Sequence, residues 1–126
     1  MANSTTLTVL SHTNTNRGCA LKDVSIVHRM PNVEVISLSI NSIDTLENFA
    51  SCTMLQELYL RKNEIKNINE ILHLSQLQFL KKLSLEDNPC TTTDNYRLTV
   101  LKALPNLEFL DNVRYVFSVS WFDKLF

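Results

Sequence analysis

The residues of this sequence that could perform catalysis or bind a metal are few and scattered. His12, His28 and His73 lie far apart, and none has a second ligand at the spacing of a metal site. The single glycine, Gly18, excludes a glycine-rich phosphate loop. The sequence therefore predicts no catalytic residue, no metal site and no cofactor, and we expect that the chain is not an enzyme.

The cysteines also lack the pattern of a functional site. Cys19, Cys52 and Cys90 are odd in number and widely spaced, which fits reduced thiols in a cytosolic or nuclear protein better than a disulfide framework. Cys52 falls on an apolar position of the repeat described below. We therefore expect a buried, inert thiol at Cys52 rather than a nucleophile.

Length and charge exclude further classes of protein. The chain has 126 residues, enough for one compact domain, and a net charge of −1 with both signs interspersed. This balance disfavours electrostatic binding to nucleic acid or to a membrane surface. The N-terminus lacks the pattern of a signal peptide, and no run of about 20 apolar residues could span a membrane. We expect a cytoplasmic protein without direct nucleic-acid or membrane contacts.

One pattern, L-x-x-L-x-L-x-x-N, occurs three times, with any aliphatic residue at the leucine positions. The asparagines of the copies, Asn41, Asn63 and Asn88, are 22 and 25 residues apart, inside the range of leucine-rich repeats. A partial fourth copy covers residues 107–111. The aliphatic positions are Val33, Ile36 and Leu38, then Leu55, Leu58 and Leu60, then Leu80, Leu83 and Leu85.

Between these copies, apolar residues recur at every third position. The alternation in each L-x-L segment predicts a short strand with one buried face, whereas strict period three predicts a 3₁₀ or similarly tight return. No single repeat can bury its apolar edge alone, so the repeats must stack. The period-three positions are Leu21, Val24, Val27, Met30 and Val33; Ile43, Leu46, Phe49, Cys52 and Leu55; and Ile65, Ile68, Ile71, Leu74, Leu77 and Leu80.

The recurring asparagines predict an asparagine ladder, consisting of Asn41, Asn63 and Asn88, inside the coil. The bend that leaves each strand exposes backbone N–H and C=O groups, and an asparagine amide can both donate to and accept from them. We therefore expect these three residues to have a structural role.

The C-terminal part of the repeat region, residues 88–112, breaks the period of three and predicts a cap. An amphipathic helix is expected to begin at Asp94 as its N-cap and to end before Pro105. An open solenoid needs such a cap to cover its last core layer. The predicted buried face of the helix consists of Tyr96, Val100, Leu101 and Leu104.

The two ends of the chain depart from the repeat. Counting back by one repeat places polar Asn14 and Asn16 where a strand should be apolar, so we begin the repeat at Leu21 and interpret residues 1–20 as a degenerate N-terminal cap. Residues 113–126 form an apolar tail whose first half alternates like a strand. This tail either packs on the cap or forms an exposed apolar patch, which would be a partner site or an aggregation hazard.

These patterns predict an α/β solenoid. Residues 21–112 would form a short, right-handed leucine-rich repeat coil with a small parallel sheet on its concave face, and the cap at residues 88–112 would contain a single helix.

The segment from Asn88 to Asp111 reads N-P-x₆-Y-R-x₂-V-x₃-L-P-x-L-x₂-L-D, which resembles the C-terminal cap of the SDS22-like leucine-rich repeat proteins. That family includes the U2 small nuclear ribonucleoprotein A′ and several ciliary and axonemal proteins. Three longer strings closely resemble one ciliary member: MPNVEVISLSINSIDTLE, LQELYLRKNEI and YRLTVLKALPNLEFLDN.

The resemblance implies a cytosolic protein of the basal body and cilium or flagellum that binds other proteins, among them a NIMA-related kinase. Family members continue into a helical oligomerisation segment that is not in this sequence, so a monomer is expected. The first interpretation is a protein-binding scaffold in cilium assembly. The alternative is a ribonucleoprotein component like the A′ protein, which supports an RNA-binding partner.

The residues that alternate with the buried strand positions should form the concave face of the sheet. Tyrosine and arginine are enriched at interface hot spots, and solenoids commonly bind protein ligands on this face. The alternative is a merely soluble sheet face. The candidate protein-binding residues are Val35, Ser37, Ser39, Glu57, Tyr59, Arg61, Lys82, Ser84, Glu86 and Phe109, with Asp111 next to Phe109.

Overall fold

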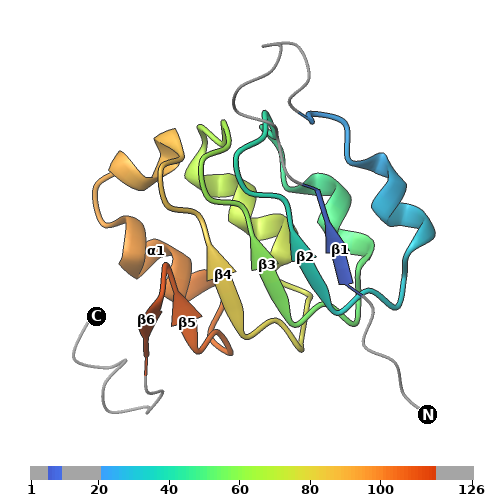
Figure 1. Cartoon of the computed structure of the whole chain (residues 1–126). Coiled ribbons are helices and arrows are strands. Elements are labelled where there is room, and N and C mark those ends of the chain that lie inside the picture. The colour runs from blue at the N-terminus through green and yellow to red at the C-terminus, as the bar shows by residue number, and fades with distance from the viewer. Residues whose placement is uncertain (1–5, 10–20, 116–126) are drawn as a thin grey trace.

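The computed structural model describes residues 6–9 and 21–115 of the chain, and its elements form one stack of coils (Figure 1). The strands are β1 (Thr6–Thr8), β2 (Val35–Ser37), β3 (Glu57–Tyr59), β4 (Lys82–Ser84), β5 (Phe109–Leu110) and β6 (Val113–Arg114). The helices are the 3₁₀ helices η2 (Ser25–Arg29), η3 (Glu47–Ser51), η4 (Ile68–Leu74) and η5 (Pro89–Thr92), and the α-helix α1 (Tyr96–Ala103).

The strands form a single sheet in chain order. Strands β1 to β5 pair in parallel, and β6 pairs with β5 in the antiparallel direction. The register aligns equivalent repeat positions, so that Ile36 lies beside Leu58 and Leu58 beside Leu83. The expected leucine-rich repeat solenoid with a small, mostly parallel sheet is therefore confirmed.

The return segments behave as the period of three indicates. Each contains a 3₁₀ helix, and these helices pack side by side, η2 on η3, η3 on η4 and η4 on α1. All of them lie behind the sheet in Figure 1, and no described element crosses its front, concave face. The core lies between the two layers, and Phe49, at the centre of η3, is its largest fully buried side chain.

The cap helix is shorter than the sequence predicts. It begins at Tyr96, and the preceding residue Asn95 is the N-cap, in a left-handed conformation and without a side-chain capping bond. The predicted N-cap at Asp94 is therefore wrong, because the turn at Asn95 separates Asp94 from the helix. The predicted buried face is correct, since Tyr96, Val100, Leu101 and Leu104 are all buried.

The N-terminal region contains a strand that no repeat pattern predicts. Strand β1 extends the sheet beyond the first repeat and pairs Leu7 with Ile36. The positions reached by counting back one repeat, Asn14 and Asn16, and the thiol of Cys19 lie outside the described residues. In the tail, the alternation becomes strand β6 over Val113–Arg114, and residues 116–126 lie outside the described part.

Candidate interaction surface

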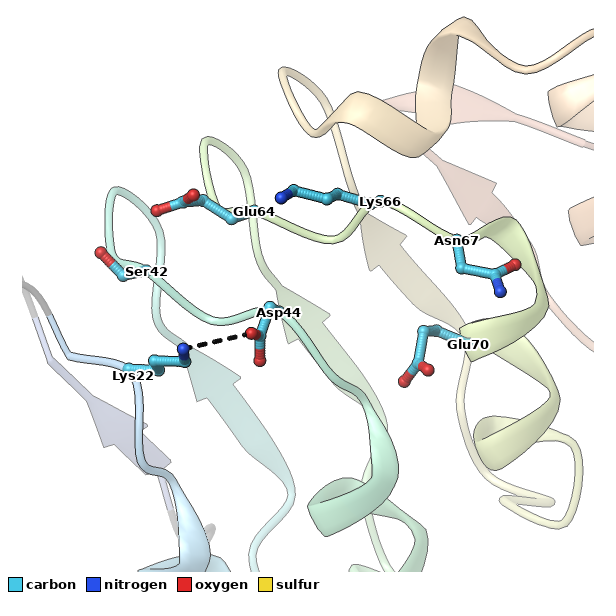
Figure 2. Close-up of a pocket in the computed structure, with 7 residues that line it drawn as sticks. All are labelled: Lys22, Ser42, Asp44, Glu64, Lys66, Asn67 and Glu70. Carbon is cyan, nitrogen blue, oxygen red and sulfur yellow. Dashed lines mark ion pairs between the residues drawn. The ribbon is translucent and has the colours of Figure 1, made fainter.

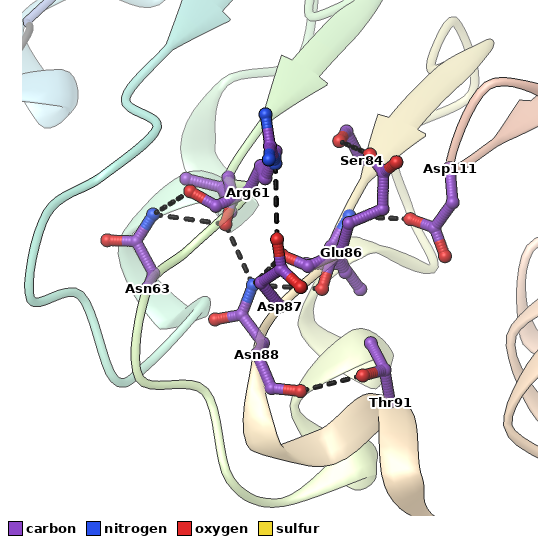
Figure 3. Close-up of polar contacts among 10 residues, drawn as sticks. Arg61, Asn63, Ser84, Glu86, Asp87, Asn88, Thr91 and Asp111 are labelled. Carbon is purple, nitrogen blue, oxygen red and sulfur yellow. Dashed lines mark hydrogen bonds and ion pairs between the residues drawn. The ribbon is translucent and has the colours of Figure 1, made fainter.

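The asparagine ladder is buried inside the coil, and Figure 3 shows two of its members, Asn63 and Asn88. Asn63 accepts a hydrogen bond from the backbone N–H of Ile43 at 2.9 Å and donates to the carbonyl oxygens of Leu38 and Leu60, both at 3.0 Å. Asn41 and Asn88 make equivalent contacts with their neighbouring coils. The ladder thus joins consecutive repeats through buried polar groups and is not available to a ligand.

A backbone feature accompanies each asparagine. Ile40, Lys62 and Asp87 directly precede the three ladder residues, and all have φ between 58° and 61°. Positive φ is unfavourable for residues other than glycine, above all for a β-branched residue such as Ile40. The asparagine hydrogen bonds therefore stabilise a bend that the local sequence disfavours, which explains how the fold manages with one glycine.

Asp111 does not lie on the concave face, and the prediction that placed it next to Phe109 there is wrong. It is buried, with φ of 52°, and its carboxylate turns into the cap instead of facing outward. Its Oδ1 accepts the Leu85 N–H at 2.7 Å, while Oδ2 accepts the Tyr96 hydroxyl at 2.9 Å and lies 3.7 Å from the Arg97 guanidinium. Burial, and then the Asp111 carboxylate, raise the pKa of the Tyr96 hydroxyl well above its usual value.

The concave row follows the sheet register. Val35, Glu57, Lys82 and Phe109 lie side by side on four successive strands, and all are half-buried. A second row across the strands consists of Ser37, Tyr59 and Ser84, which are in register. Two residues further along each segment, beyond the strand ends, come Ser39, Arg61 and Glu86. Ser84 differs from the others because it is buried, with 6% of its surface exposed.

Several concave side chains are held by their neighbours. The Tyr59 hydroxyl donates to the Glu57 carboxylate, and burial together with Glu57 raises the pKa of Tyr59 to about 12. Ser84 donates to Glu86 at 2.7 Å, which gives its buried hydroxyl a hydrogen-bond partner. The Arg61 guanidinium lies 3.2 Å from Asp87 (Figure 3). The centre of the face is therefore ordered before any partner binds.

A hollow of about 180 Å³ lies at the C-terminal end of this face. Two aromatic side chains, Tyr59 and Phe109, contribute to its lining, and the Lys82 ammonium lies 5.0 Å from the centre of the Phe109 ring. The remaining lining residues are Leu83, Ser84 and Asn112. This combination of aromatic surface and charge is the kind found at protein interfaces.

A larger hollow of about 320 Å³, which sequence reasoning missed, lies along the segments that follow the strands (Figure 2). Its lining is highly charged, and Lys22 pairs with Asp44 at 3.4 Å while Glu70 accepts the Leu46 N–H. Lys22, Asp44 and Lys66 recur at intervals of 22 residues, which is the one sequence signal that could have indicated it. The full lining is Lys22, Ser42, Asp44, Glu64, Lys66, Asn67 and Glu70.

The residues suited to catalysis do not come together in the part of the chain that the structure describes. Cys52 and Cys90 are both buried free thiols, and burial raises the pKa of each. His28 contacts Asn48 and Ser51 on the convex side, and His73 lies beside Glu70. Within residues 6–9 and 21–115, no group of three or more histidines, cysteines or carboxylates could hold a metal ion. None of the helices in that part of the chain is long and apolar enough to cross a membrane.

A parallel strand, a buried asparagine and a 3₁₀ return in each coil define a leucine-rich repeat protein. The chain belongs to this family, since the family model described as "Leucine-rich repeat" matches residues 21–116. It is 50% identical over 97 residues to cilia- and flagella-associated protein 410 of Mus musculus, covering 75% of this chain and 39% of that protein. The resemblance to a ciliary member is thus confirmed, and the chain spans about two fifths of that relative's length.

Solved structures show the same fold. The Mex67 leucine-rich repeat domain from Chaetomium thermophilum has a TM-score of 0.60 and 26% identity, covering 77% of this chain and 68% of that one. The Drosophila melanogaster SNF/U2A′ complex contains a chain with a TM-score of 0.56 and 18% identity, covering 76% of this chain and 68% of that one. The likeness to U2A′ is one of fold alone.

Proposed function

We propose that this chain is a non-enzymatic, protein-binding module that acts in cilium or flagellum assembly, and that the concave face is its binding surface. The observation that supports this most directly is the half-buried row Val35, Glu57, Lys82 and Phe109 on a sheet face that no described element covers. The helices bury the opposite face, so the concave row is free of any role in the core.

The ordered polar contacts on this face favour a protein ligand. Tyr59 is fixed by Glu57 and Arg61 lies against Asp87, so a partner would meet side chains that have already lost much of their freedom. A prearranged surface binds at a lower cost in conformational entropy. Tyr59 and Arg61 also belong to the residue types that dominate interface energetics.

The ciliary role comes from the resemblance to cilia- and flagella-associated protein 410. In this proposal the protein is cytoplasmic and located at the basal body, where it acts as a scaffold, and a NIMA-related kinase is a candidate partner. No feature of the site favours the alternative of a ribonucleoprotein component, because the likeness to U2A′, at 18% identity, is one of fold alone.

The test is proximity labelling in ciliated cells with this chain as bait, in the wild-type form and as the Tyr59→Ala/Arg61→Ala double variant. We expect basal-body and ciliary proteins to be labelled by the wild type and to be depleted with the double variant. Spliceosomal proteins in their place would favour the ribonucleoprotein alternative. Undiminished labelling of every partner by a folded double variant would move the interface away from the concave face.

A further inference from the structure

The C-terminal end of the concave face places two cations beside one aromatic ring. Lys82 on β4 is in register with Phe109 on β5, and Phe109 is paired with Arg114 on the antiparallel strand β6. Directly opposed residues of neighbouring strands project from the same face of a sheet. Lys82, Phe109 and Arg114 therefore form a continuous row on the concave side.

Neither cation in this row is neutralised by a carboxylate of the described residues. Lys82 is in register with Glu57, but it forms no ion pair with it, because Glu57 accepts the Tyr59 hydroxyl and the Lys82 ammonium lies over the Phe109 ring. The Arg114 side chain is exposed and makes no ion pair or hydrogen bond with residues 6–9 and 21–115.

Three other cations of the described residues are ion-paired. Arg61 pairs with Asp87, Lys22 pairs with Asp44, and Arg97 pairs with Asp111. The charges of Lys82 and Arg114, which no carboxylate of the described residues neutralises, lie beside Phe109 and adjoin the hollow of about 180 Å³.

The hollow itself suits an apolar side chain. Tyr59 and Phe109 supply its aromatic lining, and the Ser84 hydroxyl at its base already donates to Glu86. The hydroxyl of Tyr59 is likewise engaged by Glu57. The two hydroxyl groups of the lining are thus already engaged within the chain, and an apolar group that enters the hollow would gain from burial against two rings.

We propose that this end of the concave face binds an acidic segment of a protein partner. One bulky apolar side chain of that segment would enter the hollow between Tyr59 and Phe109, and adjacent carboxylates would pair with Lys82 and Arg114. Glu57 on β3 repels carboxylates on that side of Lys82, so the acidic residues would lie toward β5 and β6. This inference rests on the proposed function and specifies the chemistry of the partner.

The experiment titrates the full chain with short synthetic peptides and follows backbone amide shifts and affinity by NMR. The probe peptide contains one phenylalanine followed by two aspartates among glycines and serines. One control peptide has asparagines in place of the aspartates, and another has serine in place of the phenylalanine. We expect the acidic peptide to bind tightest, to shift amides of β4 to β6, and to bind more weakly when sodium chloride rises from about 50 to about 500 mM.

Matched charge variants locate the site. Lys82→Gln/Arg114→Gln should weaken binding of the acidic peptide about fivefold, the effect of losing two exposed ion pairs. Arg29→Gln/Lys66→Gln removes the same charge from exposed positions away from the row and should change affinity less than about twofold. Equal binding of the acidic and neutral peptides, or equal losses in the two double variants, would overturn the proposal.

This outcome is separable from the failure of the proposed function. If the peptides show no preference for acidic residues but labelling of cellular partners still depends on Tyr59 and Arg61, only the inference about the partner's chemistry is wrong. If cellular partners ignore Tyr59 and Arg61, the concave face itself is excluded.

Discussion

Tyr96 donates a hydrogen bond of 2.9 Å to one carboxylate oxygen of Asp111, whose other oxygen accepts the Leu85 N–H at 2.7 Å. In the two preceding coils the equivalent N–H groups, of Leu38 and Leu60, donate to backbone carbonyls of the next strand. The Asp111 carboxylate therefore replaces the backbone acceptor at the point where the parallel sheet ends. Asp111 therefore adds a polar link between the cap helix and the last full repeat, beside the packing of α1 on η4.

Removing the Tyr96 hydroxyl should destabilise the fold. Tyr96→Phe leaves the buried Asp111 carboxylate without one of its donors, at a cost of about 1–3 kcal/mol in the free energy of unfolding. Urea denaturation measures this change. Tyr115→Phe, which removes a hydroxyl bonded to Arg97 at the exposed side of the cap, should cost about 1 kcal/mol or less. A Tyr96→Phe variant as stable as the wild type would show that Asp111 does not depend on this bond.

The same contact predicts a loss of stability at alkaline pH. Because the pKa of Tyr96 is raised in the folded state, its contribution is fully present below about pH 10, the pKa of an unfolded tyrosine, and decreases as the pH rises beyond it. Tyr96→Phe should therefore flatten the decline of the urea midpoint above about pH 10. Tyr59→Phe should flatten it less, because the pKa of Tyr59 is raised only to about 12. Parallel profiles for wild type and Tyr96→Phe would contradict this reasoning.

The asparagine ladder should be essential for stability. Asn63→Ala removes a buried acceptor for the Ile43 N–H and donors to two carbonyls, so we expect a loss of about 1–3 kcal/mol or more. Asn69→Ala is the matched control, because that side chain is exposed on η4, and its loss should cost about 0.5 kcal/mol or less. Thermal unfolding of both variants measures the difference. Equal melting shifts in the two variants would mean that the hydrogen bonds of Asn63 stabilise the fold no more than the exposed amide of Asn69 does.

The solenoid was readable from the sequence because its signals are local and periodic. The positions of Leu58, Leu60 and Asn63 follow directly from the L-x-L-x-x-N pattern, and the period of three places Phe49 and Cys52 in the core. Every repeat presents the same pattern, so a stacking order follows without any knowledge of distant contacts.

The features that sequence reasoning missed depend on non-periodic contacts. Strand β1 pairs Leu7 with Ile36 across a segment without any repeat, and no local pattern indicates such a pairing. Asp111 turns inward because the backbone has positive φ there, which a strand alternation cannot predict. The alternation in the sequence predicts which residues line the concave face. It does not predict the burial of Ser84 or the hollow beside it, because these depend on the side-chain positions of Glu86 and Phe109.

Cys52 should react slowly with thiol reagents in the folded protein. Its side chain is fully buried within the core, and burial raises the pKa of its thiol, so little thiolate is present or accessible at neutral pH. A Cys19→Ser/Cys90→Ser background isolates its reaction. We expect denaturant to accelerate labelling strongly, whereas fast labelling under native conditions would show that the coil opens at η3.

Binding and stability should separate between the two faces of strand β3. Leu60 is fully buried immediately beyond the end of the strand, whereas Tyr59 and Arg61 beside it project to the concave side. Leu60→Ala opens a cavity and should cost about 2–5 kcal/mol of unfolding free energy. Tyr59→Ala/Arg61→Ala opens none, and the exposed Arg61–Asp87 pair contributes little, so stability should change by about 1 kcal/mol or less.

Affinity for a purified ciliary partner should fall more in Tyr59→Ala/Arg61→Ala than in Leu60→Ala, which is the reverse of their order in lost stability. The double variant loses an aromatic and a cationic anchor, for which we expect a fall of about thirtyfold, or about 2 kcal/mol. Leu60→Ala, measured at a temperature where circular dichroism shows it folded, should bind within a few fold of the wild type, because the cavity lies beneath the surface. If instead affinity falls with stability in both variants, the concave side chains act only through the fold, and the binding surface lies elsewhere on the molecule.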